Sequence, residues 1–348
     1  MLGFTVRSVG AVAGAALLAA AGSMLGGTAS AAPAAAQPAS GTGYSVTGSL
    51  SAVAATSASN AWAVGSAGGA SLILHWNGKS WARQASPAGG LGAVAASSAA
   101  NAWAVGNALA VHWNGKSWQR VPLPDLAGES LSGVAVTSAS NAWAVGSYGT
   151  TTVETLILHW NGKKWSRIAT PAVRKSSARE TYSLSGVSAS SASNVWMVGT
   201  LVYPAAGPVG GVTLHWNGKA WSEGPNAAGV QTSVAAASAA DVWTSGCICA
   251  GNPGPVDTAH WNGKSWAYPR NPFSTPGGGF GAGYGVVAAA GNVAWTAGFH
   301  SASSSVTPFL MRWTGSTASC PLSPRRTFPY RRRSFIAMIS RWSARPST

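Results

Sequence analysis

LSAVAATSASNAWAVGSAGGASLILHWNGKSWARQASP, residues 50–87, is the stretch that decides the fold, because variants of it recur along the chain. Further copies begin at Leu91, Leu131 and Leu184, near Ser233 and at Tyr284. The first Trp of each copy marks a period of 40–53 residues, at Trp62, Trp103, Trp143, Trp196, Trp243 and Trp295. A period of this size is typical of a repeated unit made of four short strands.

Each copy divides into four short apolar runs that are separated by Gly, Asn and Ser. In the first copy the predicted strands are Leu50–Ala55, Ala61–Gly65, Leu72–Trp76 and Ser80–Gln84. The runs lack the three-to-four residue spacing of an amphipathic helix. A single four-stranded sheet cannot bury its own apolar faces, so tandem copies must pack on one another. We therefore predict an all-β chain, a β-propeller of about six four-stranded blades, with seven blades as the competing architecture.

Two of the connections within a blade are nearly constant. The first two strands are joined by TSASN or a close variant, and we expect its Asn60 to bond to nearby backbone and start a tight turn. The last two strands are joined by Asn-Gly, as at Asn77-Gly78. This dipeptide predicts a hairpin with a type I′ turn, in which both turn residues have positive φ.

The copies resemble the blades of secreted bacterial β-propellers, in the group that includes kelch-like and BNR/Asp-box repeat proteins. The resemblance covers residues 50–315, and GKSW at Gly78–Trp81 matches the end of an Asp-box. Trp76 stands where that box has its Asp, and Leu74 where it has Ser or Thr. The resemblance implies the propeller fold, whereas propellers carry many unrelated functions.

Trp and His recur at fixed positions of the copies. We expect the first Trp of each copy to pack in the core. One His occupies a single position in five copies, and copy six has Arg312 there: His75, His112, His159, His215 and His260. A ring of His could bind metal, but one His per blade places these side chains too far apart to share an ion. We interpret them as structural, hydrogen-bonded residues and predict no metal site and no cofactor.

Loop length varies at one face of the predicted disc. The first-to-second and third-to-fourth strand turns are short, whereas the other two connections vary, from Asn107-Ala108 to the twelve residues 172–183, 200–211 and 247–258. These connections leave from the same edge of an antiparallel blade, and repeat proteins commonly carry insertions on the binding face. The alternative is tolerated surface variation. The predicted ligand contacts on this face are Tyr148, Arg174, Lys175, Arg179, Tyr182 and Tyr203.

The sequence offers little for covalent chemistry. It has only seven acidic residues, and no two of them occupy equivalent places in the repeats. Glycoside cleavage usually needs two opposed carboxylates, and no nucleophile elbow or phosphate loop is present. We predict no catalytic residues and a binding or scaffold module, monomeric, whose partner is a protein or a glycan. The alternatives are a carbohydrate-binding lectin and a sialidase-like glycoside hydrolase.

Cys247 and Cys249 lie together in the long connection of copy five. In an exported chain they form either a local disulfide, which would be strained at a separation of two residues, or free thiols.

Both ends of the chain differ from the repeats. Residues 1–31 hold Arg7, a short apolar run and Ala29-Ser30-Ala31, which together predict a secretory signal peptide cleaved after Ala31 and an extracellular protein. A membrane anchor is the alternative, but the apolar run is shorter than a span requires. Residues 32–43 suit a flexible linker.

The net charge of +15 is concentrated at the C-terminus, because residues 319–348 hold seven Arg and no acid. The body, residues 44–318, is only mildly basic and shows no basic stripe with stacking aromatics, so we predict no nucleic-acid partner. The tail is interpreted as a frame disruption near Ser316–Ser319, or as a native basic tail. Copy six then lacks its fourth strand, and Tyr44–Gly48 is predicted to pair there and close the ring.

Overall fold

The computed structural model describes residues 46–149, 154–171, 173, 181–203, 207–224, 229–247, 256–269, 280–289, 293–302, 305–314 and 317–319. The regular structure in these ranges consists of strands. They include no helix that could cross a membrane. The prediction of an all-β fold is therefore confirmed.

The strands form six four-stranded antiparallel sheets, which we call blades one to six in chain order. Blades one to three contain β1 (Ser49–Ser57), β2 (Asn60–Ala67), β3 (Ala70–Trp76), β4 (Trp81–Gln84), β5 (Leu91–Ser98), β6 (Asn101–Gly106), β7 (Leu109–Trp113), β8 (Trp118–Arg120), β9 (Ser130–Ser138), β10 (Asn141–Tyr148), β11 (Glu154–Trp160) and β12 (Trp165–Arg167). Blades four to six contain β13 (Thr181–Ser191), β14 (Asn194–Tyr203), β15 (Gly207–Trp216), β16 (Trp221–Glu223), β17 (Val230–Ser238), β18 (Asp241–Cys247), β19 (Val256–Trp261), β20 (Trp266–Ala267), β21 (Phe280–Ala289), β22 (Val293–Ala302), β23 (Ser305–Thr314) and β24 (Thr317–Ser319).

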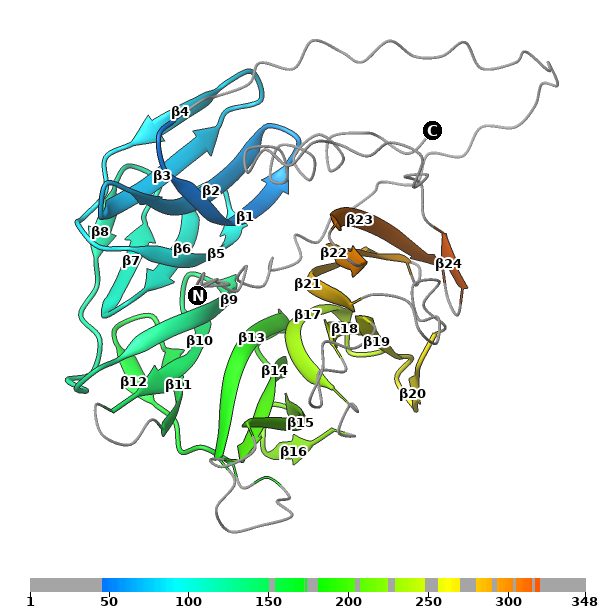
Figure 1. Ribbon diagram of the computed structural model, residues 1–348. Helices are drawn as coiled ribbons and strands as arrows, with labels where there is room; N and C mark the ends of the chain where they lie inside the picture. Colours follow the sequence, from blue (N-terminus) through cyan, green and yellow to red (C-terminus); the bar gives the residue numbers. More distant parts are fainter. Residues whose placement is uncertain are drawn as a thin grey trace, which may run out of the picture.

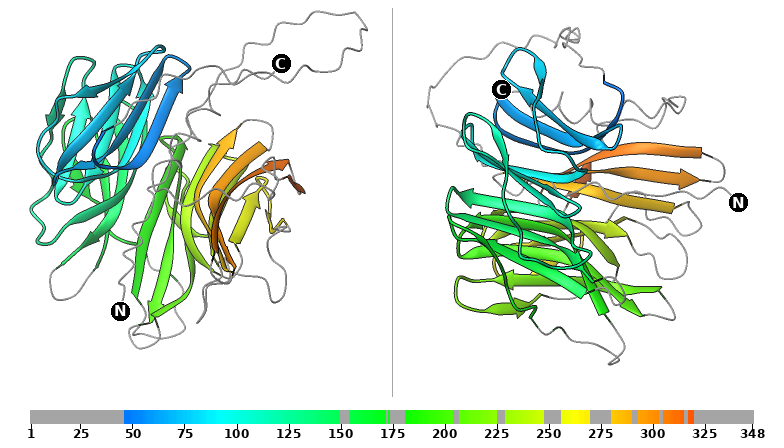
Figure 2. Two further views of the ribbon diagram at one scale, coloured as in Figure 1. Left: turned by 45° about the horizontal axis from the view of Figure 1, so that its top comes forward. Right: turned by 90° about the vertical axis from the view of Figure 1, so that its left-hand side faces the viewer.

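The blades are arranged around a common centre as in a β-propeller, with the first strand of each blade innermost (Figure 1). Contacts between blades follow the chain, from β1 to β5, β9, β13, β17 and β21 in turn. In the described ranges, β21 and β1 make no contact of that kind. In Figure 1 the ribbons of blades one and six stand apart, and the two other views show the same succession of blades (Figure 2).

The predicted role of Tyr44–Gly48 as the fourth strand of blade six is wrong. The short strand β24 occupies that position, because Thr317–Ser319 pairs with Arg312–Thr314 of β23. Of the predicted segment, residues 46–48 are described and belong to no strand. Gly48 lies beside β2 of blade one, close to Ser66 and Ala67. The first residues after the repeats thus complete the last blade although they lack its sequence pattern.

All three predicted long loops are shorter, because some of their residues belong to strands; in the loop 247–258 these are Cys247 of β18 and residues 256–258 of β19. β13 already begins at Thr181, inside the predicted connection 172–183. Most of the predicted loop 200–211 belongs to β14 and β15, which pair as far as Tyr203 and Gly207. The insertion in blade four therefore lengthens two strands at the variable face. The sequence pattern does not indicate these longer strands, because Gly and Pro interrupt the segment.

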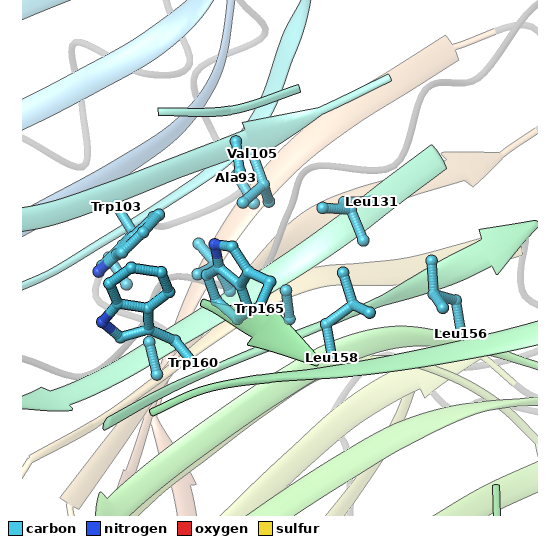
Figure 3. Packing of buried hydrophobic residues seen from close by; sticks show 13 residues of the cluster. Ala93, Trp103, Val105, Leu131, Leu156, Leu158, Trp160 and Trp165 are labelled. Carbon is cyan, nitrogen blue, oxygen red and sulfur yellow. The ribbon is translucent and has the colours of Figure 1, made fainter. Parts of the chain in front are cut away.

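Apolar side chains fill the junctions between consecutive blades. Figure 3 shows the junction of blades two and three, where Trp103 and Val105 of β6 meet Leu158, Trp160 and Trp165 of β11 and β12. The same pattern joins blades one and two, where Trp62 and Val64 pack with Leu109, Val111 and Trp118. Removing this apolar surface from water is the main favourable contribution to stability. The predicted packing of the first Trp in each copy agrees with this arrangement in blades one to five.

The connection between the third and fourth strands of a blade is not the predicted type I′ turn. In blade one only Gly78 has positive φ, at 91°, whereas Asn77 does not. Residues 77–80 connect the paired Trp76 and Trp81. The Asn77 Oδ1 accepts hydrogen bonds from the backbone N–H groups of Lys79 and Ser80, both at 2.9 Å. The hairpin is present, but an Asn side chain closes its turn where a second residue with positive φ was expected.

Candidate functional site

A hydrogen-bonded His lies at the outer part of each of the first five blades. His75 Nε2 donates to Asn60 Oδ1 at 2.8 Å, and the same bond recurs at 2.7–3.0 Å in the pairs His112–Asn101, His159–Asn141, His215–Asn194 and His260–Asp241. Asn60 Nδ2 in turn donates to Thr56 Oγ1 at 2.7 Å. The Asn side chain thus bonds to side chains of its blade, where a bond to nearby backbone was expected. These contacts agree with a structural role for the His.

Each of these His side chains also packs against the first Trp of its blade, stacked in four blades and tilted by 35° at His159. The ring centroids of Trp62 and His75 are 4.2 Å apart, and those of Trp243 and His260 are 4.0 Å apart. Burial between the Trp ring and the sheet lowers the pKa of His75, His112, His159 and His215 below the ordinary value of 6.5. Among the described residues, no three His, Cys, Asp or Glu side chains gather as a metal site would require.

We expect the protein to lose stability as the pH falls below 6.5. A His with a lower pKa in the folded state than its ordinary value of 6.5 takes up its proton more readily when unfolded. Stability is therefore retained above pH 6.5 and decreases as the pH falls toward the folded-state pKa values. Thermal denaturation between pH 7.5 and 5.5 measures this slope. His159→Gln keeps an N–H donor for Asn141 and should make stability depend less steeply on pH. An unchanged dependence would show that His159 does not contribute to the loss of stability.

The junction between blades three and four is looser than the two before it. Trp62 lies 4.9 and 5.0 Å from Trp113 and Trp118, measured between ring centroids. The corresponding distances from Trp143 are 6.1 Å to Trp216 and 5.7 Å to Trp221. Here the rings leave a pocket of about 360 Å³, lined by Asn141, Trp143, His159, Ile168, Ala192, Trp216, Gly218 and Trp221.

Within the described residues, the pocket has indole donors without a protein acceptor, at Trp216 and at the buried Trp143. In four other blades the equivalent Trp donates from Nε1 to a carbonyl oxygen of the first turn at 2.9–3.1 Å, in the pairs Trp76–Ala58, Trp113–Ala99, Trp160–Ala139 and Trp261–Ala239. Trp216 makes no such bond to any residue in the described part of the chain, although Ala192 lies across the pocket from it. The pocket therefore offers aromatic faces together with a free N–H group.

Tyr148, one of the predicted ligand contacts, lies at the other end of the strands. Tyr148 is the last residue of β10, and Arg167 of β12 places its guanidinium carbon 4.3 Å from the centre of the Tyr148 ring. The Tyr148 hydroxyl donates to Glu154 and accepts from Arg167, which also lies 3.7 Å from Glu154. The hydrogen bond to Glu154 raises the pKa of Tyr148. Glu154 and Arg167 were not among the predicted contacts, because neither lies in the long variable loops.

The other predicted contacts are only partly described. Tyr182 is half-buried, its hydroxyl donates to the Pro171 carbonyl at 2.8 Å, and burial raises its pKa to about 12. Tyr203 ends β14, but its side chain lies outside the described residues. Arg174, Lys175 and Arg179 lie outside them altogether. The Tyr182 carbonyl accepts a hydrogen bond from the Thr155 hydroxyl, so its backbone lies beside the residue that follows Glu154, the partner of Tyr148. Ligand binding at this face stays a prediction.

Blade five carries the two cysteines for which the sequence left a disulfide and free thiols as alternatives. The backbone of Cys247 ends β18 and pairs with Val256. Its side chain and Cys249 lie outside the described residues, so the choice between a disulfide and free thiols stays as the sequence left it.

Comparison with family models and with curated proteins found no match. Solved structures match at low identity. The six-bladed lectin of Aleuria aurantia is 15% identical, with a TM-score of 0.49, over 79% of this chain and 95% of the lectin. The SapL1 lectin, solved with alpha methyl fucoside, is 14% identical, with a TM-score of 0.48, over 81% and 98% of the two chains. A xyloglucanase from Xanthomonas campestris is 15% identical, with a TM-score of 0.54, over 80% of this chain and 46% of the enzyme. At these identities the likeness concerns the fold alone, and the six four-stranded sheets identify that fold as a multi-bladed β-propeller.

Proposed function

We propose that the chain is a secreted, non-catalytic recognition module that binds a glycan in the pocket between blades three and four. The observation that supports this function is the combination of three Trp rings with the unbonded Nε1–H of Trp216. The C–H face of a sugar ring packs well on an indole, and its hydroxyl groups accept hydrogen bonds from N–H donors. Export rests on the features of residues 1–31, and the kelch or Asp-box character of the blades rests on Gly78–Trp81.

Replacing Trp216 tests this function. We expect Trp216→Ala to lower glycan affinity at least about tenfold, which corresponds to about 1.4 kcal/mol. The matched control is Trp261→Ala, because Trp261 holds the same position in blade five and its indole is bonded to the Ala239 carbonyl. A glycan array with the mature protein identifies the ligand, and calorimetry compares the variants. Equal losses in both variants, with the fold retained by circular dichroism, would refute the pocket as the site.

Two further arms separate the alternatives. Replacing residues 172–180 with a short Gly-Ser linker removes the predicted contacts Arg174, Lys175 and Arg179. If this replacement abolishes binding and Trp216→Ala does not, the ligand binds at the variable face. Turnover of fluorogenic glycosides by the mature protein would support the hydrolase alternative and contradict a non-catalytic module.

A further inference from the structure

Five blades present a Lys on turns of the same construction. In each, the Asn side chain accepts hydrogen bonds from the backbone N–H groups two and three residues after it. The Gly that follows the Asn has a φ of 90–92°. The residue after that Gly is an exposed Lys: Lys79, Lys116, Lys163, Lys219 and Lys264. Blade three adds the exposed Lys164. Because the turns are closed in the same way, they hold these Lys residues at equivalent positions.

These turns all lie at one edge of the propeller, which we call the turn edge. Within blade one, a Cβ placed on Gly78 would lie 2.9 Å from the Ser59 side chain, so the two short turns of the blade adjoin. Between blades, Trp62 near the start of β2 contacts Trp113 and Trp118, which flank the next Lys turn. Successive blades are therefore aligned with the same end of their strands at this edge, and the Lys residues follow its rim.

Acidic side chains are confined to other places in the described part of the chain. Asp125 and Glu129 precede β9, Glu154 begins β11 and Glu223 ends β16, all at the opposite end of the strands. Asp241 lies at the turn edge, but it is buried and bonded to His260 at 3.0 Å. The described turn edge thus carries exposed positive charge without exposed acids. A surface of one sign attracts an oppositely charged polymer and increases its rate of association.

The pocket between blades three and four opens at this same edge. Gly218, which lines it, directly precedes Lys219, and Lys163 and Lys164 lie on the turn of blade three. A glycan that enters the pocket would therefore pass close to the Lys residues of two blades. Lys acts as a mobile point charge, which suits repeated contacts with a flexible chain better than bidentate recognition of a single group. Weak contacts of this kind gain affinity when several are made by one polymer.

We infer that the turn edge binds an acidic polysaccharide, a polymer with regularly repeated carboxylates, with the Lys turns of successive blades contacting successive negative groups. This inference rests on the proposed glycan-binding function and specifies its substrate class. A polysaccharide fits better than a nucleic acid because the Trp rings in the described part of this edge are buried or half-buried. A nucleic acid would need exposed rings on which successive bases could stack.

The test uses the full mature chain with polygalacturonate as the acidic probe and dextran as the neutral one. The variant replaces the five turn residues with Gln, at Lys79, Lys116, Lys163, Lys219 and Lys264. The control removes the same charge from the C-terminal tail, by Gln at Arg325, Arg326, Arg331, Arg332 and Arg333. We expect at least a tenfold loss of polygalacturonate affinity in the turn variant and less than a threefold loss in the tail variant. Raising NaCl from 20 to 300 mM should weaken binding of the unmodified protein.

Equal losses in the two variants, or equal binding of dextran and polygalacturonate, would overturn the inference. Equally tight, Lys-dependent binding of single-stranded DNA would overturn the choice of a polysaccharide. A variant in which all five turn Lys residues are replaced by Arg should keep its affinity for polygalacturonate. This variant controls for damage to the turns. If Trp216→Ala abolishes binding of a neutral sugar and polygalacturonate does not bind, the proposed function stands and this inference fails. If polygalacturonate binds through the Lys turns and Trp216→Ala changes the affinity for no glycan, this inference stands and the pocket between blades three and four is not the glycan site.

Discussion

Trp103→Ala is expected to lower the free energy of unfolding by about 3–5 kcal/mol, the usual cost of removing a buried Trp. The Trp103 side chain is fully buried between blades two and three. Its ring lies 4.5 Å from His112 and 4.9 Å from both Trp160 and Trp165, measured between centroids. The substitution removes the apolar surface and leaves a cavity among side chains that belong to two separate sheets. Urea denaturation followed by circular dichroism measures the loss.

Trp81→Ala is the control for this substitution. Trp81 is only half-buried, and in the described part of the chain its one ring contact is with Trp76, at 5.8 Å. Its removal should cost about 1 kcal/mol, because less surface returns to water. A loss at Trp103 as small as that at Trp81 would show that the junctions between blades contribute little to stability.

Gly106→Ala is expected to destabilise the protein by about 3 kcal/mol, at the upper end of the usual cost of overpacking. A Cβ at Gly106 would lie 1.9 Å from the carbonyl oxygen of Gly90, which is backbone and cannot rotate away. The neighbouring strand shifts its register at this point, between Leu91 and Ala93. The same close approach recurs at Gly65, Gly146, Gly199 and Gly246, with 1.8–1.9 Å to a carbonyl oxygen.

Gly90→Ala provides the matched control, because a Cβ there would meet no atom within 4 Å. It should leave stability unchanged or raise it by about 0.5 kcal/mol through a smaller entropy of the unfolded chain. Differential scanning calorimetry of the two variants makes the comparison. If Gly106→Ala melts at the temperature of Gly90→Ala, the contact with the Gly90 carbonyl does not constrain the sheet.

The strands could be predicted from the sequence because each is a short apolar run bounded by Gly, Asn or Ser, and because the pattern repeats. The predicted strand Leu72–Trp76 lies within β3, and Leu50–Ala55 within β1. β24 could not be predicted, because Thr317–Ser319 lacks the Trp that marks the fourth strand elsewhere. Pairing with β23 requires only its backbone groups, and these are the same in any sequence without Pro.

The pocket could not be predicted either, because the residues that line it occur in other copies as well. Trp216 has the same neighbours in sequence as Trp76, namely a His before it and Asn-Gly after it. What differs among the described residues is the indole of Trp216, which lacks the bond to the first turn that Trp261 makes, although the ring separations at the junction of blades four and five, 6.0 and 5.6 Å, are about as large. The turn-edge Lys residues, in contrast, were visible in the sequence, but the confinement of exposed acids to the other end of the strands became apparent only from the topology.

Among the described strands, blades one and six share no junction like those between consecutive blades, which gives the series of described blades two ends. The junctions of these strands therefore follow the chain, and we treat the stability as that of a linear array, a sum over blades and junctions. Loss of a terminal blade removes one junction, whereas loss of an internal blade removes two. Unfolding is therefore easiest from blade one or blade six, and the junction of blades three and four, where the pocket lies, is the last to be reached from either side.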